Sequence, residues 1–155
     1  STQGEQYIQS VYEQLPPEDK NSVERVVIAG QKAMFSQETH KYMLEALNKD
    51  GDMAEKLSVG MIQFVIVLLQ QAKGNIPPNV MLPAASILLM KACEYVDKTM
   101  GGITMEIFSE ANSMMLTGIH RKVEEARAQD GQPQNVQPEQ PQPGIVGQPA
   151  PQGGM

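Results

Sequence analysis

One cysteine and two histidines are the residues best suited to catalysis. Cys93 lies in the apolar run MKACEYV, where a nucleophilic thiol would need a neighbouring base and a lowered pKa. His40 and His120 belong to other predicted helices, and nothing in the sequence places either beside Cys93. A small buried hydrophobic residue explains the cysteine as well, and we adopt that interpretation.

A second candidate is the segment NKDGD at Asn48–Asp52, which has the composition of a calcium loop. With Gly51 at the sixth loop position, the first falls on Ala46 and the twelfth on Leu57. Neither side chain can supply the oxygen ligand required there. The segment therefore predicts a turn followed by a helix that Asp52 caps.

The basic cluster His120–Lys122, with Arg127, could bind nucleic acid or an acidic neighbour. Placement of cations near a helix C-terminus, interleaved with glutamates, explains it more simply. With 12 Lys and Arg against 18 Asp and Glu, the net charge of -6 argues against attraction to nucleic acid. A single Cys excludes an internal disulfide and a Cys-based metal site. No GxGxxG, GxxxxGK[ST], HExxH, GxSxG or CxxC motif occurs, so we expect no enzyme, cofactor or metal.

The elements that carry these residues are predicted to be helical. Apolar residues recur at three- and four-residue spacing through 1–130, and no alternating run indicates a strand. Asp52 with Glu55 predicts an N-terminal capping box, and Gly74 a left-handed helix stop. We expect an all-α bundle of five or six helices, at about residues 7–15, 18–35, 37–47, 52–73, 82–100 and 104–128.

Composition divides the chain into a helical domain, 1–130, and a low-complexity tail, 131–155. In the tail, six Pro, seven Gln and five Gly fill 18 of 25 positions. Pro and Gly oppose regular structure, and little apolar surface is present to offset the entropy of ordering. We expect an extended C-terminal arm with a polyproline II bias.

Two predicted helices are apolar on nearly every face, Leu57–Leu69 and Val80–Met90. The short connector predicts an antiparallel hairpin, and a bundle of this size seldom buries two such helices completely. We therefore expect the hairpin to join subunits in a homo-oligomer. The predicted interface residues are Leu57, Met61, Phe64, Val65, Leu68, Leu69, Val80, Leu82, Ile87, Leu88 and Met90.

Methionine and glycine leave two further alternatives open. The 11 Met residues could form a repacking or partner-binding surface, but ordinary core filling is the simpler interpretation. Gly101-Gly102, and Gly74 with Pro77-Pro78, could be hinges around the fifth helix, but simple helix stops explain them. The most apolar stretch, Val59–Leu69, is 11 residues and about 16 Å long as a helix, too short to span a bilayer alone.

The run GNIPPNVMLPAASILLMKACEYVDKTMGG at Gly74–Gly102 is flanked by Met-rich helices and followed by the Gln/Pro/Gly-rich tail. In this overall composition and order of segments, the chain resembles the short helical virion proteins of tailed bacteriophages, particularly structural and DNA-ejection components of short-tailed phages. The resemblance implies a multi-copy subunit packaged in the particle, beside the portal or expelled with the genome to build a conduit across the cell envelope.

Our first hypothesis is therefore a non-enzymatic phage structural subunit that assembles into a ring or tube with other virion proteins. It would be made in the bacterial host cytoplasm, and the polar residues 1–14 show no secretory signal. The arm would lie along a neighbour. The residues that we expect to make this contact are Pro138, Pro141, Pro143, Ile145 and Val146.

Two other hypotheses stay open. In one, many hairpins together line an envelope pore, with membrane contact only after assembly. In the other, the protein is a cytoplasmic adaptor or chaperone that binds partner helices in a Met-rich groove.

Overall fold

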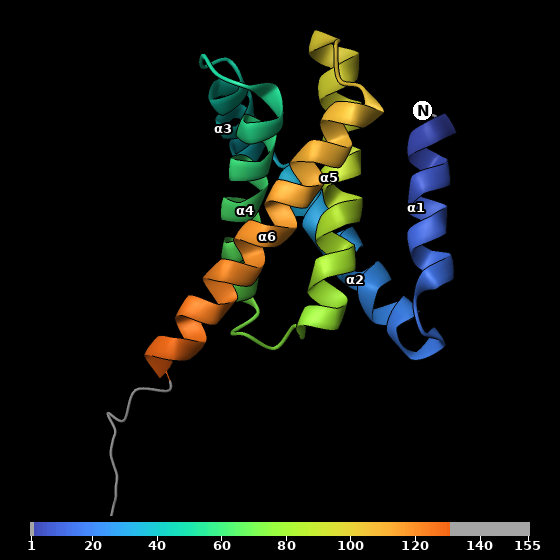
Figure 1. Cartoon of the computed structure of the whole chain (residues 1–155), viewed down its shortest axis with the longest axis vertical. Helices are drawn as coiled ribbons and strands as arrows, with labels where there is room; N and C mark the ends of the chain where they lie inside the picture. Colours follow the sequence, from blue (N-terminus) through green and yellow to red (C-terminus); the bar gives the residue numbers. More distant parts are fainter. Residues whose placement is uncertain (1, 131–155) are drawn as a thin grey trace, which may run out of the picture. The chain divides into compact units, whose positions relative to one another are not determined.

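The computed structural model describes residues 2–130, which form six α-helices and no β-strand (Figure 1). The predicted all-α class is therefore confirmed over this range. The helices are α1 (Thr2–Gln14), α2 (Pro17–Met34), α3 (Gln37–Leu47), α4 (Met53–Gln71), α5 (Pro78–Met100) and α6 (Met105–Asp130).

The chain divides into two compact units between Ile119 and His120, so α6 runs across the division. The first unit holds α1 to α5 and the start of α6. The described part of the second unit is the C-terminal end of α6. The predicted tail, 131–155, lies outside the described residues, so its extended form stays a prediction.

Both ends of α4 follow the predicted signals. The Asp52 carboxylate accepts a hydrogen bond of 3.1 Å from the Glu55 backbone N–H, which satisfies one of the free donors of the first turn. At the other end the left-handed conformation begins one residue earlier than predicted, at Lys73 (φ +56°), and continues at Gly74 (φ +71°), whose N–H donates to the Leu69 carbonyl over 2.9 Å. This is the bond of a left-handed helix stop.

The prediction for the start of α5 is wrong by one turn, because the helix begins at Pro78 and not near Leu82. Proline suits the first helical position because no partner is available there for its missing N–H. Pro83 consequently lies inside the helix, where the bond to the Asn79 carbonyl is lost. The helix ends at Met100, and the following Gly101 has φ +76°, consistent with a simple stop.

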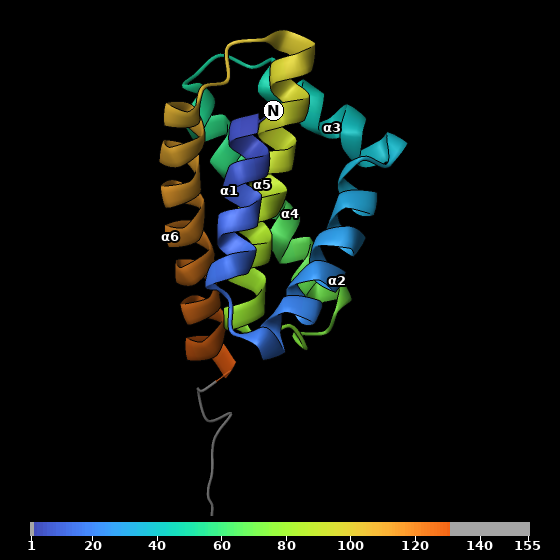
Figure 2. The same cartoon turned by 90° about the vertical axis from the view of Figure 1, so that its right-hand side faces the viewer.

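The core of the first unit is built around α5, which is buried from Val80 to Val96 on most sides. It packs against α2, α1 and α4, and Figure 2 shows α1, α2 and α4 around it. Close approach depends on glycine: a Cβ at Gly30 would lie 2.7 Å from Leu88 Cδ1. A Cβ at Gly4 would likewise collide with Glu94 of α5.

The start of α6 also belongs to this core. Its buried side chains recur every three or four residues, at Phe108, Ala111, Met115 and Ile119. The Phe108 ring packs edge-on against Tyr7 of α1, with 4.8 Å between ring centroids. Since α1 and α6 are far apart in sequence, this pair ties the two ends of the first unit together.

Candidate functional site

The most distinctive surface feature is an apolar groove between α3 and α4, with a volume of about 340 Å³. We call it the α3–α4 groove. Its walls are one stripe of α3, including Tyr42 and Met43, and one stripe of α4, including Phe64 and Val67. The floor includes Ala92 of α5. The groove is partly open to solvent, and its volume is within the range of small-ligand sites.

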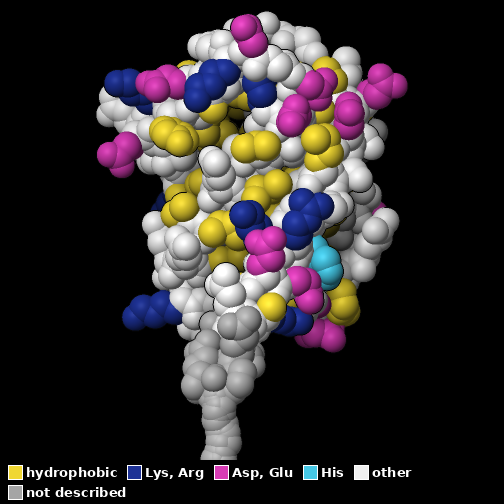
Figure 3. All heavy atoms as spheres, turned by 60° about the vertical axis from the view of Figure 1, so that its left-hand side comes forward, with side chains coloured by type: hydrophobic (Ala, Val, Ile, Leu, Met, Phe, Trp, Pro, Cys, Tyr) yellow, Lys and Arg dark blue, Asp and Glu magenta, His cyan; other side chains and the backbone are white. Residues whose placement is uncertain are grey.

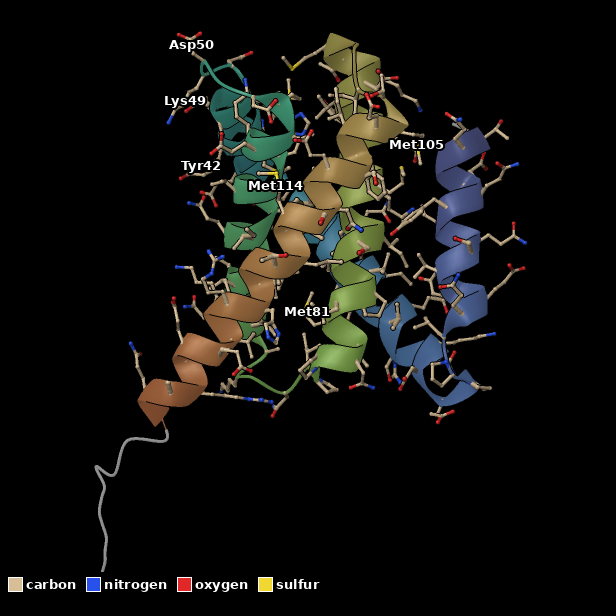
Figure 4. All side chains as sticks on the ribbon, in the orientation of Figure 1. Tyr42, Lys49, Asp50, Met81, Met105 and Met114 are labelled. Atoms are coloured by element: carbon tan, nitrogen blue, oxygen red, sulfur yellow. The ribbon has the colours of Figure 1, made fainter. Side chains whose placement is uncertain are left out.

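Exposed apolar side chains border the groove. Tyr42 is 68% exposed and Val67 is 46% exposed, and Tyr42 points outward from α3 (Figure 4). On the side of the molecule shown in Figure 3, hydrophobic side chains gather between charged ones. A large apolar surface framed by polar residues is typical of a site where another chain binds.

A glycine widens the groove in the middle of α4. Gly60 lines the groove, and a Cβ built on it would meet no atom within 4 Å. The helix therefore has no packing reason for glycine here, although glycine costs a helix interior about 1 kcal/mol relative to alanine. The open space beside Gly60 belongs to the groove.

Two sets of polar contacts hold α3 in place as the outer wall. The Lys56 ammonium donates to the carbonyls of Leu47 (2.9 Å) and Lys49 (2.5 Å), so it closes the C-terminal end of α3. Near the start of α3, His40 Nε2 and the Tyr95 hydroxyl share a hydrogen bond of 2.6 Å. This bond connects α3 to α5.

The predicted interface residues divide into two groups. Seven of them are at most 5% exposed and belong to the core of the first unit: Leu57, Met61, Val65, Val80, Ile87, Leu88 and Met90. Their assignment to a surface is wrong, because the chain's own helices already enclose them. The other four, Phe64, Leu68, Leu69 and Leu82, are half-buried.

Cys93 is 2% exposed, in agreement with the interpretation as a buried hydrophobic residue. Burial, together with the smaller effect of the nearby charges of Glu94 and Asp97, raises the pKa of its thiol from 9.0 to about 12. A thiol of this kind carries almost no thiolate at neutral pH and is a poor nucleophile. His40, one of the two histidines considered as a base for Cys93, bonds to Tyr95.

The segment Asn48–Asp52 and the basic cluster of α6 also have structural roles. Asn48–Asp52 forms a turn, whose Lys49 and Asp50 side chains are exposed at its tip (Figure 4). In the second unit, Arg127 Nη1 lies 3.5 Å from Glu124 Oε1 on the same helix, as the helix-surface interpretation of the basic cluster requires. Within residues 2–130, no group of three or more His, Cys, Asp or Glu side chains is placed to hold a metal ion.

Some methionines fill the core and others lie partly or largely exposed. Met34, Met61, Met81, Met90 and Met115 are at most 2% exposed and fill the core, whereas Met43 is half-buried in the wall of the α3–α4 groove. Met100 and Met114 are exposed by 44% and 37%. The predicted arm contacts Pro138, Pro141, Pro143, Ile145 and Val146 lie outside the described residues.

The stretch Val59–Leu69, which we expect to be too short to span a bilayer alone, is only the centre of α4. The helix has 19 residues and is long and apolar enough, by length and composition alone, to cross a membrane. The sequence estimate counted only its apolar centre, Val59–Leu69. Its most apolar window is only 28% buried within the chain, so α4 is not enclosed like an ordinary core helix.

Sequence reasoning missed most of the groove lining, including Tyr42, Gly60 and Val67. Gly60 gave a usable signal, because glycine inside a strongly apolar helix points to a special environment. The His40–Tyr95 contact gave none, since 55 residues separate its members. No family model, no curated protein and no solved structure matches this chain.

Proposed function

We propose that this protein is a non-enzymatic structural subunit of a phage particle that associates with copies of itself through the exposed side of α4. The observation that carries the proposal is the partial burial of an apolar helix of 19 residues, beside an open apolar groove. Self-association would remove this surface from water in each copy.

Covering the exposed side of α4 is energetically favourable. Burial of apolar surface contributes about 25 cal/mol per Å², and α4 leaves Val59 and Val67 about half exposed, at 47% and 46%. Phe64, Leu68 and Leu69 beside them are only half-buried. Aromatic residues and methionine, which are enriched at protein interfaces, line the groove as Phe64, Tyr42 and Met43.

A binding role agrees better with the described residues than a catalytic one. The one thiol is buried with a raised pKa, and the groove lining is mainly apolar, with Lys56 as its charged member. The Lys56 ammonium is held by two backbone carbonyls at the end of α3, so it acts as a structural brace. These features support a subunit that assembles.

The assignment of this protein to a virion rests on its resemblance, in composition and sequence pattern, to short helical virion proteins. In this proposal the exposed side of α4 is covered by neighbouring copies in a ring or tube. The extended arm lies along a neighbour, and the assembly takes part in genome ejection.

The test is the sedimentation of the full chain, with two matched variants of α4. Val67→Asp and Val59→Asp change equally exposed valines of the same helix, but only Val67 lines the groove. We expect the unmodified chain to form a defined oligomer, Val67→Asp to dissociate it, and Val59→Asp to weaken it less. A folded monomer at every concentration, or an oligomer unchanged by Val67→Asp, would contradict the proposal.

A second candidate function, a pore-lining ejection protein, has support from the length and exposure of α4. In that case oligomers would insert α4 into a bilayer, where about 20 apolar residues are needed. The full chain should then release a dye trapped in vesicles of bacterial lipids. No release at any ratio of protein to lipid would exclude this candidate.

A further inference from the structure

We propose that the α3–α4 groove binds the proline-rich segment 138–146 of a second copy of this chain. The inference rests on the proposed function, because it requires that copies associate. It goes further by naming the segment and the site that it occupies.

The groove has the features that bind a proline-rich segment. Such segments bind in the polyproline II form to grooves lined by aromatic rings. Tyr42 and Phe64 provide the rings, one on each wall. The exposed amides of Gln63 and Gln71 lie along the same groove, where they can donate to the backbone carbonyls of an extended chain.

The length of the groove along α4 matches the length of the segment 138–146. The lining residues of α4 run from Lys56 to Gln71, which corresponds to about 22 Å at 1.5 Å per residue. Nine residues in the polyproline II form span about 25 Å at 3.1 Å per residue. The segment 138–146, PEQPQPGIV, has this length.

The chemistry of the segment is complementary to that of the groove. Pro138 and Pro141 are three residues apart, so they fall on one face of a polyproline II helix. Ile145 and Val146 are the adjacent apolar pair of the tail, and they suit the apolar lining at Val67 and Leu68. Glu139, the one charged side chain of 131–155, is opposite in sign to Lys56, the charged residue of the groove lining.

The chain is long enough to make this connection between copies. Residues 131–155 follow α6, and seven residues separate Asp130 from Pro138. An extended chain covers at most about 3.3–3.6 Å per residue, so the linker can extend roughly 25 Å. A second contact tethered to the same chain adds affinity through its effective concentration.

The first experiment is disulfide trapping between two full-length variants. One carries Val67→Cys and the other Ile145→Cys, and the mixture is oxidised and separated without reductant. We expect a cross-linked dimer that contains one chain of each kind. The matched control is Val59→Cys with Ile145→Cys, which should cross-link at least tenfold less, since Val59 does not line the groove. The native Cys93 is buried, so the unmodified chain should give no dimer.

The second experiment fills the groove. Gly60→Leu adds a side chain in open space, so the fold should be retained while the cross-link between Val67→Cys and Ile145→Cys falls about tenfold. Methyl NMR of methionine gives an independent measurement on the full chain. Ile145→Asp should shift the Met43 signal in the groove and leave the signal of Met115, buried elsewhere, unchanged.

The outcomes separate this inference from the proposed function. If the unmodified chain sediments as a monomer, the proposed function fails, and this inference fails with it. If oligomers form but the cross-link and the Met43 shift are absent, this inference alone is overturned. A disulfide within one chain carrying both cysteines, with none in the mixture, would also overturn it, because the segment would then bind its own subunit.

Discussion

The helices α4 and α5 are both strongly apolar, yet the fold treats them differently. Twelve residues of α5 are buried, against five of α4, and the difference comes from their positions. α5 is packed by α1, α2 and α4, whereas α4 packs mainly on α3 and α5, with Ile62 against Gly118 of α6. The two helices run side by side in opposite directions (Figure 1).

The comparison shows that apolar composition alone does not identify an interface. The surface available to other molecules depends on which helix the chain's own elements leave uncovered. Here that helix is α4, with α3 forming the outer wall of a groove along it. The energetic roles of the two helices can be separated by matched substitutions.

The largest expected effect is the loss of a core side chain from α5. Leu88→Ala removes a fully buried side chain and should lower the free energy of unfolding by about 3 kcal/mol, because it leaves a cavity. Leu69→Ala in half-buried surface of α4 should lower it by about 1 kcal/mol or less. Urea unfolding of both variants at low protein concentration measures this difference. Equal losses would mean that the two helices are equally enclosed.

The next effect is a change in stability of opposite sign when two glycines are each replaced by alanine. Gly30→Ala places a Cβ 2.7 Å from the buried Leu88 side chain and should destabilise the fold by about 1–3 kcal/mol through overpacking. Gly60→Ala places its Cβ in open space and should stabilise α4 by up to about 1 kcal/mol. Thermal unfolding of the two variants checks both signs. A destabilised Gly60→Ala variant would show that the groove is closed in solution.

The smallest expected effect is the pH dependence that Cys93 contributes. Since burial raises its pKa from 9.0 to about 12, folding favours the neutral thiol. Its contribution to stability is therefore complete below about pH 9 and is lost as the pH rises towards 12. The stability of the unmodified chain should fall more steeply above pH 9 than that of Cys93→Ala. Parallel curves would show that the thiol is accessible to water, and α5 less enclosed than described.

The fold was predictable where local chemistry decides it. Asp52 and Gly74 mark the two ends of α4 because a carboxylate can accept from the first-turn N–H groups and glycine tolerates a positive φ. The start of α5 was not predictable, because proline is favoured in the first turn of a helix and both Pro78 and Pro83 satisfy that rule. Only packing of Val80 and Met81 into the core favours the earlier one.

The candidate site was less predictable. The apolar residues of α4 and α5 were recognised from the sequence, but Leu57 and Leu88 were assigned to a surface although they are buried. A helix that is apolar all round carries no periodic signal to mark its exposed side. The groove itself combines residues of α2, α3, α4 and α5, and no spacing along the chain reports that combination.

By itself the sequence determined the helical class, the capping of α4 and the surplus of apolar helix, because these follow from side-chain chemistry within a few residues. Tertiary structure alone decided that α5 is enclosed, that α4 stays partly open, and that His40 and Lys56 fix α3 as the wall of a groove. The physical reason is that burial depends on which distant segments meet, and that is a property of the whole fold.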